Sequence, residues 1–181
     1  YQARTDRTTP FTMTNHTYFN LGAFAGTVLD HEVQILSDRY LAADESGVPT
    51  AEEVSVAGTD CDFRQPRLLK EAFHGMPLGF EHFYVLPTAT RSAARVATVR
   101  HAASGRQLDV LTTEPGMLFY TGRYTSDELR REDGTQFGQF RGLCVETAKY
   151  SNGPNIPQAP RCFLHPGELY DETTIYRFSW E

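Results

Sequence analysis

Cysteine, positive charge and long apolar runs are all scarce in this 181-residue sequence. Its cysteines are Cys61, Cys144 and Cys162, an odd and widely spaced set that fits neither a disulfide framework nor a paired zinc motif. We therefore expect reduced thiols and a cytoplasmic protein. No apolar run approaches the length of a membrane span, and the first residues do not have the pattern of a signal peptide. A role in a membrane is therefore not expected.

The charge balance excludes another class of partner. Lys and Arg number 17 against 23 Asp and Glu, which gives a formal net charge of −6 and a pI near 5.5. Binding to a phosphate backbone needs clustered basic side chains, and the sequence shows no such cluster, so we expect no nucleic-acid partner. The six histidines and three cysteines do not have the spacing of a metal-binding motif, so no metal site is expected either.

Short strands are what the sequence does contain. With 40% hydrophobic residues it has enough apolar material for one domain with a core, and we expect residues 1–181 to form a single unit. Residues 95–100 and 107–113 flank a turn at 103–106, which predicts a hairpin, and residues 173–180 alternate as a closing strand. Many short strands separated by turns favour an all-β protein with an antiparallel sandwich or barrel.

Two other segments have weaker patterns. Apolar and polar residues alternate over residues 11–16, which predicts a strand with His16 near its end. Residues 68–73 are the best helical candidate, and they would form only about two turns.

An acidic residue interrupts an otherwise apolar strand. Residues 142–147 are bounded by Gly142 and by the turn-rich residues 151–155, which is typical of a buried strand. In such a strand Cys144 and Glu146 point to the same side. Because burial of an unpaired charge is costly, Glu146 either faces a cleft or reaches water at the end of the strand. The pattern alone leaves both interpretations open.

Short motifs stand in a defined order along nearly the whole chain. They are residues 15–21 (NHTYFNL), 58–64 (GTDCDFR), 113–116 (TEPG), 119–122 (FYTG), 144–147 (CVET), 164–168 (LHPGE) and 176–178 (YRF). Each motif is weak by itself, whereas the ordered set is specific. Together they resemble the aldose 1-epimerase, or galactose mutarotase, family.

The resemblance implies an antiparallel β-sandwich, chemistry that needs no cofactor, and a free hexose as the small-molecule substrate. It implies that Glu146 is the general base, which takes a proton from the C1 hydroxyl, and that His16 is the general acid, which protonates the ring oxygen. Each positioned group of this kind contributes about 10²–10⁴-fold to a rate. Because Glu146 must be ionised while His16 is protonated, a bell-shaped pH dependence is expected.

The resemblance also implies four substrate-binding candidates. Glu81 stands where the family usually has an Asp that hydrogen-bonds sugar hydroxyls, and Asn155 matches a closing Asn of the family. Asn15 opens the first motif, and Tyr120 is a candidate for an apolar wall against the sugar. His82 follows Glu81 directly along a strand, so its side chain should face the other way and pack.

Other features leave the function open. The family's chain is longer at the N-terminus, so the resemblance implies that residues 1–181 are the C-terminal portion of a larger protein. An epimerase for a hexose 6-phosphate would need a basic cluster, which the scattered Arg64, Arg67 and Arg123 do not form. A sugar-binding or regulatory module without turnover is the other alternative. Ala148 and Arg123 stand where the family usually has Gln and Asn, which leaves the sugar preference open. The oligomeric state is open as well.

Overall fold

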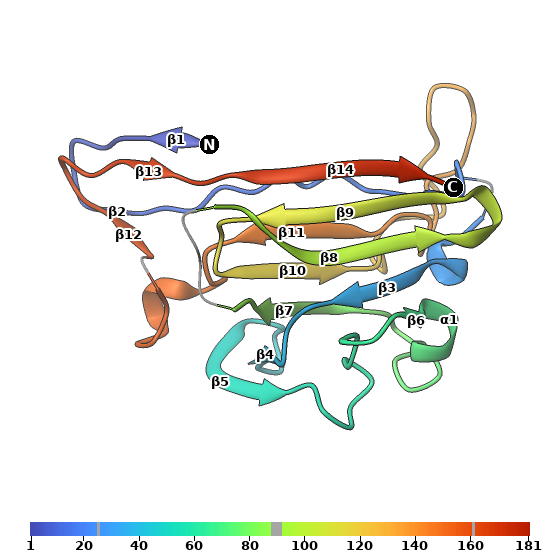
Figure 1. Cartoon of the computed structure of the whole chain (residues 1–181), viewed down its shortest axis with the longest axis horizontal. Coiled ribbons are helices and arrows are strands. Elements are labelled where there is room, and N and C mark those ends of the chain that lie inside the picture. The colour runs from blue at the N-terminus through green and yellow to red at the C-terminus, as the bar shows by residue number, and fades with distance from the viewer. Residues whose placement is uncertain (25, 88–91, 161) are drawn as a thin grey trace.

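Antiparallel pairing dominates the computed structural model of the chain, which describes residues 1–24, 26–87, 92–160 and 162–181 (Figure 1). Two five-stranded antiparallel sheets form its body. In spatial order the first sheet contains β11 (Cys144–Ala148), β10 (Gly116–Tyr120), β7 (Glu81–Val85), β4 (Arg39–Ala43) and β5 (Pro49–Ser55). The second contains β14 (Thr174–Trp180), β9 (Arg106–Thr112), β8 (Ala94–His101), β3 (Glu32–Ile35) and β6 (Arg67–Leu68).

The remaining elements are short. Two strand pairs lie outside the large sheets, and the helical elements span three or four residues each. These elements are β1 (Gln2–Ala3) with β13 (Tyr170–Asp171), β2 (Thr9–Pro10) with β12 (Phe163–Leu164), helix α1 (Leu69–Ala72), and the 3₁₀ helices η1 (Val28–Asp30), η2 (Ala102–Ser104) and η3 (Gly153–Asn155). Within the described ranges, the structure contains no helix long and apolar enough to cross a membrane.

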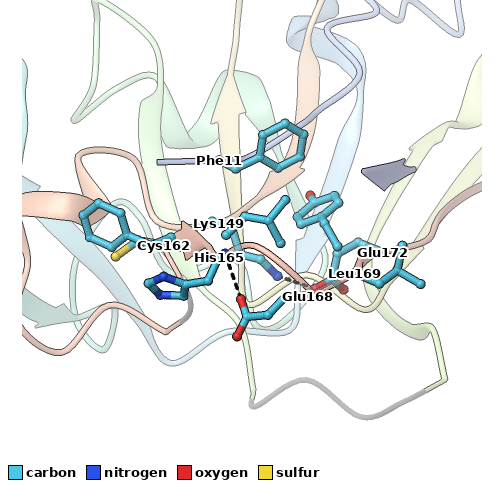
Figure 2. Close-up of a pocket in the computed structure, with 10 residues that line it drawn as sticks. Phe11, Lys149, Cys162, His165, Glu168, Leu169 and Glu172 are labelled. Atoms are coloured by element: carbon cyan, nitrogen blue, oxygen red, sulfur yellow. Dashed lines mark hydrogen bonds and ion pairs between the residues drawn. The ribbon is translucent and has the colours of Figure 1, made fainter. Parts of the chain in front are cut away.

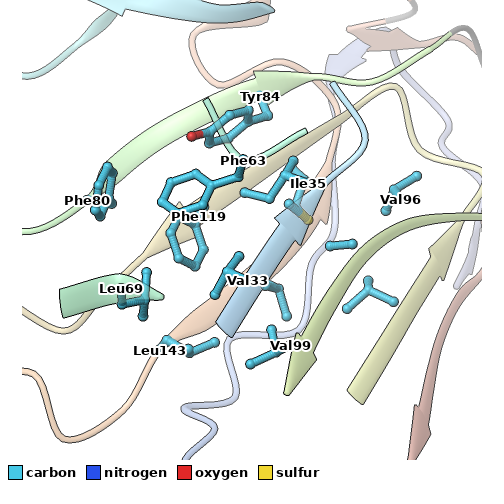
Figure 3. Packing of buried hydrophobic residues seen from close by; sticks show 14 of the residues in the cluster. Val33, Ile35, Phe63, Leu69, Phe80, Tyr84, Val96, Val99, Phe119 and Leu143 are labelled. Atoms are coloured by element: carbon cyan, nitrogen blue, oxygen red, sulfur yellow. The ribbon is translucent and has the colours of Figure 1, made fainter. Parts of the chain in front are cut away.

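The main core lies between the two sheets. Val33 and Val99 of the second sheet belong to the same buried cluster as Tyr84 and Phe119 of the first (Figure 3). Full burial of one such side chain is worth about 1.5–3 kcal/mol. The prediction of an all-β antiparallel sandwich is therefore confirmed, as are the hairpin, which is β8 and β9, and the closing strand, which is β14.

The predicted helix is shorter than expected. Helix α1 makes a single turn, because Leu68 pairs with Glu32 in the ladder between β6 and β3 and so leaves the helical segment. A helix this short depends on its contacts with the rest of the fold, since isolated helices of a few residues are unstable. Leu69, which is fully buried, makes such a contact.

The face of the first sheet that points away from the core carries the polar groups of interest. Strand register sets Tyr120 opposite both Cys144 on β11 and Glu81 on β7, and sets Leu118 opposite Glu146. Residues directly opposite each other in a ladder share a face, as do residues two apart on one strand. Glu81, Tyr120, Cys144 and Glu146 therefore lie on one face.

The prediction of a strand over residues 11–16 is wrong. The segment runs antiparallel to the free edge of β11, but its first contact there is from the Lys149 backbone N–H to the Thr12 hydroxyl, rather than to a backbone carbonyl. A backbone bridge forms only further on, where Phe19 and Leu143 exchange N–H···O bonds of 2.8 and 2.9 Å. Residues 12–16 are all exposed, and Phe11 packs edge to face on Tyr170, so the alternation does not mark a buried face of a sheet.

The packing of β10 gives a test of the fold. A Cβ atom on Gly116 would stand well inside van der Waals contact with two ring atoms of Phe83 on β7. We expect Gly116→Ala to destabilise the fold by about 1–3 kcal/mol, the usual cost of overpacking. Gly26→Ala is the matched control, because nothing lies within 4 Å of a Cβ there. Urea denaturation measures both, and equal midpoints would contradict this description of β10.

Candidate active site

Glu146 is a carboxylate held in the middle of a buried strand. Only 6% of the residue is exposed, and no donor in the described ranges forms a hydrogen bond with its Oε1 atom. Burial raises the Glu146 pKa; the charge of His16 opposes this, and the charge of Glu81 adds to it. A buried carboxylate with a raised pKa has the increased proton affinity that a general base needs. Of the two interpretations of residue 146, the one that places it at a strand end in water does not hold.

His16 reaches Glu146 from the segment that runs along the edge of β11. Its Nε2 lies 3.5 Å from Glu146 Oε1, and its Nδ1 lies 3.5 Å from Cys144 Sγ. The imidazole stacks on the Tyr18 ring at a centroid distance of 5.1 Å. The side chain of His16 remains 54% exposed, so it can exchange protons with solvent. The geometry therefore joins a buried acceptor to an accessible, protonatable donor.

Tyr120 and Glu81 lie beside this pair. Tyr120 is buried, contacts Tyr18 edge to face at 6.1 Å, and its hydroxyl accepts a hydrogen bond from the Tyr124 N–H. Glu81 is exposed directly across the ladder. A cavity of about 430 Å³ opens along the same strands, and its lining includes Glu81 and Leu118, the residue opposite Glu146. The cavity meets the site at Glu81, whereas His16, Tyr120 and Glu146 do not line it.

The two predicted asparagines have other contacts. The Asn15 side chain is exposed and accepts a hydrogen bond from the Thr17 N–H. On η3 the Asn155 amide donates to Asn152 Oδ1 at 2.6 Å. In the described part of the chain, no recorded contact joins either amide to His16 or Glu146. The structure thus gathers four of the six predicted site residues and gives each asparagine a bond within its own loop.

His82 is a packing residue, as predicted from the strand alternation. Its ring lies edge-on to Tyr40 at 5.2 Å, and burial lowers its pKa. Cys144 and Tyr18, by contrast, are neighbours of His16 that the sequence did not identify. The position of Cys144 two residues before Glu146 was a usable signal, because it places the thiol on the same face.

A larger cavity, of about 530 Å³, lies away from His16 and Glu146 (Figure 2). Lys149 lines it and is almost completely buried; its ammonium group forms ion pairs with Glu114 Oε2, at 3.0 Å, and with Glu172. The Tyr170 hydroxyl donates to the other oxygen of Glu114. Burial raises the Glu114 pKa, against the effects of Tyr170 and Lys149. The charged side chains of this group pair with one another, although Glu114 Oε2 meets Lys149 as an ion pair and not as a hydrogen bond, so we interpret the group as structural.

The charge of Glu81 should have a measurable effect on the pKa of Glu146. Because a like charge nearby disfavours ionisation, Glu81→Gln is expected to lower the Glu146 pKa. Glu128→Gln, which removes an exposed carboxylate in the loop after β10, serves as the control. The Glu146 carboxyl carbon can be followed by NMR across a pH titration. An unchanged pKa in Glu81→Gln would show that the two carboxylates do not interact.

Comparison with known proteins shows the family of the chain. The family model described as aldose 1-epimerase matches residues 1–177. Mouse galactose mutarotase is 41% identical over 181 residues, and Escherichia coli aldose 1-epimerase is 37% identical over 186. These matches cover 99% and 98% of this chain and 53% of each relative. The chain therefore spans about half the length of the curated relatives it matches.

Solved structures give the same result for the fold. An aldose epimerase homologue from C. elegans superposes with a TM-score of 0.85 at 27% identity, over 99% of this chain and 54% of the other. The galactose 1-epimerase of Lactobacillus acidophilus superposes with a TM-score of 0.80 at 26% identity, over 99% and 52%. The resemblance inferred from the ordered motifs is confirmed, and so is the mutarotase type of sandwich. The chain belongs to the aldose 1-epimerase family.

Proposed function

We propose that the protein interconverts the α and β anomers of a free hexose such as galactose or glucose. The observation that carries this proposal is the distance of 3.5 Å between His16 Nε2 and the buried carboxylate of Glu146. The relatives of this chain include proteins named galactose mutarotase and aldose 1-epimerase. Because those relatives are about twice as long, we also propose that residues 1–181 act as one β-sandwich unit of a longer chain.

In the proposed reaction the sugar lies with its anomeric carbon between the two groups. Glu146 takes the proton of the C1 hydroxyl while His16 gives a proton to the ring oxygen. The bond between C1 and the ring oxygen breaks, its electron pair stays on that oxygen, and C1 becomes an aldehyde carbon. Rotation about the C1–C2 bond presents the other face, and reclosure returns both protons. Burial favours this chemistry because it raises the proton affinity of Glu146.

We propose that Glu81 and Tyr120 hold the sugar. The Glu81 carboxylate, exposed in the cavity next to Leu118, would accept hydrogen bonds from sugar hydroxyls, and the Tyr120 ring would contact a less polar face of the sugar. Asn15 and Asn155 remain proposed binders, since both residues are exposed. We also propose a cytoplasmic location, which is supported by the free thiols of Cys61, Cys144 and Cys162.

Comparison of substrates and one variant tests this proposal. Freshly dissolved α-galactose, α-glucose and glucose 6-phosphate would be followed by polarimetry with the protein and with Glu146→Gln. We expect faster equilibration of a free hexose with the protein only, and retained sugar binding by the variant in NMR titration. Faster equilibration of glucose 6-phosphate than of the free hexoses would identify a sugar phosphate, rather than a free hexose, as the substrate. Sugar binding without turnover would identify a binding module, and turnover that persists in Glu146→Gln would reject Glu146 as the base.

A further inference from the structure

Three different donor atoms converge where His16 approaches β11. His16, Cys144 and Glu146 offer an imidazole nitrogen, a thiol sulfur and a carboxylate oxygen, and one atom from each lies within 4.8 Å of the other two. The strand supplies two of these groups on one face, and the segment along its edge supplies the third. The chemistry of this set differs from that of a purely acidic cluster, because it combines nitrogen, sulfur and oxygen.

An unsatisfied atom points into the same place. Among the described residues, Glu146 Oε1 is buried and accepts no hydrogen bond, and His16 Nε2 lies 3.5 Å from it. Cys144 is fully buried, and its Sγ contacts His16 Nδ1, also at 3.5 Å. A buried acceptor without a donor costs about 1–3 kcal/mol, and a bound cation would remove that cost. This unsatisfied acceptor is an observation independent of the clustering.

We infer that His16, Cys144 and Glu146 form a binding site for a divalent cation of the zinc type. Zn²⁺ binds thiolate sulfur at about 2.3 Å, imidazole nitrogen at about 2.0–2.1 Å and carboxylate oxygen at about 2.0–2.2 Å, usually as a tetrahedron. Ligand atoms on such a tetrahedron stand roughly 3.4–3.8 Å apart. With one ligand atom from each residue, the three atoms lie within 4.8 Å of one another, and the two separations of 3.5 Å involve different nitrogens of His16. The ligand atoms must therefore close in by up to about 1 Å to reach the tetrahedral spacing. Soft thiolate and imidazole ligands favour this class over Mg²⁺ or Ca²⁺.

Binding would require a small movement and the release of a proton. One nitrogen of His16 faces Glu146 and the other faces Cys144, so the half-exposed imidazole must turn to ligate the ion. The Cys144 thiol loses its proton to solvent as the sulfur–metal bond forms, because thiolate is the ligand. The exposed side of His16 leaves the fourth position to water. Such a site is open, like the three-ligand sites from which ions exchange.

The consequence for activity rests on the proposed function. An ion at this site would bind the carboxylate and the imidazole that are proposed to transfer protons, so it would inhibit anomer exchange reversibly. Metal binding itself does not depend on that function, and the experiment separates the two.

Cobalt provides the direct probe, because a Co²⁺–thiolate bond absorbs strongly in the near ultraviolet. We expect one Co²⁺ per protein with this absorption, and its loss on addition of Zn²⁺. Cys144→Ser should abolish the thiolate band and weaken Co²⁺ binding about tenfold or more. Cys162→Ser, which removes a thiol outside the cluster, should change neither. Glu146→Gln should keep the band and weaken binding, which tests the site a second time if Cys144→Ser does not fold.

Absence of the band in the protein, or its persistence in Cys144→Ser, would overturn the site. The rate of galactose anomer exchange provides the second readout, in which Zn²⁺ should inhibit at the concentrations that displace Co²⁺ and a chelator should restore the rate. Cobalt binding without any epimerase activity would leave the metal site standing and reject the proposed function. Activity that Zn²⁺ does not inhibit, with the band present, would reject the inhibitory role.

Discussion

Glu146→Gln is expected to slow anomer exchange by about 10²–10⁴-fold, the usual contribution of a positioned general base. The amide of glutamine occupies nearly the volume of the carboxylate but cannot take a proton from the C1 hydroxyl. His16, which lies 3.5 Å away, remains in place as a donor. Rates would be measured from the optical rotation of fresh α-galactose, with Glu128→Gln as the control at an exposed position.

The same variant should not lose stability. Burial raises the pKa of Glu146 in the folded protein above its unfolded value, so its protonated form is favoured by folding. The corresponding stabilisation is present below the unfolded pKa and is lost as the pH rises through the folded pKa. Above the folded pKa of Glu146 the buried charge destabilises the fold, and the neutral amide of the variant removes that charge. The urea midpoint of Glu146→Gln should therefore be at least that of the protein. An inactive variant with a clearly lower midpoint would indicate damage to the fold.

The second large effect is expected at Lys149. Replacement by Met leaves Glu114 and Glu172 without the ammonium group that pairs with both. Removal of one partner from a buried ion pair costs about 3–5 kcal/mol, because the remaining charge is buried alone. Lys149 follows β11 directly, so the loss should loosen the end of the strand that carries Glu146.

Lys70→Met is the matched control for this prediction. Lys70 pairs with Asp30 at 3.6 Å where both side chains are exposed, and exposed pairs contribute about 0–1 kcal/mol. Urea denaturation would compare the two variants. The deficit of Lys149→Met should shrink at acidic pH, because Glu114 has a raised pKa and loses its charge as the pH falls. Equal small effects of the two substitutions would show that the buried network does not stabilise the fold.

Alternation along single strands was enough to predict much of this structure. It placed Glu146 on a strand with Cys144 on the same side and assigned His82 to the opposite face from Glu81, because side chains alternate with a period of two whatever the partner strands are. Segments whose contacts come from distant parts of the chain were harder to predict from their own sequence. The segment before His16 has the same alternation, yet its contacts with β11 run largely through side chains.

The composition of the site depended on the resemblance and on the folded structure. No local pattern joins His16 to Glu146, because 130 positions of sequence separate them. Contacts between their segments, the pairing of Phe19 with Leu143 and the bond from Lys149 to Thr12, bring them together. The ordered motifs supplied the roles proposed for the two residues, and the structure supplied the distance between them. The contact between His16 and Cys144 could not be predicted for the same reason. The absence of a metal motif in the spacing is also why the proposed cation site was not expected.

The most direct test is exchange NMR on galactose at anomeric equilibrium. With the protein present, the H1 signals of the α and β anomers should exchange magnetisation at a rate proportional to protein concentration, while Glu146→Gln should match buffer alone. Methyl α-galactoside, which has no C1 hydroxyl, should show no exchange. Rapid exchange that survives Glu146→Gln, or no exchange with the folded protein, would contradict the assignment of Glu146 and His16 as a proton-transfer pair that is sufficient within residues 1–181.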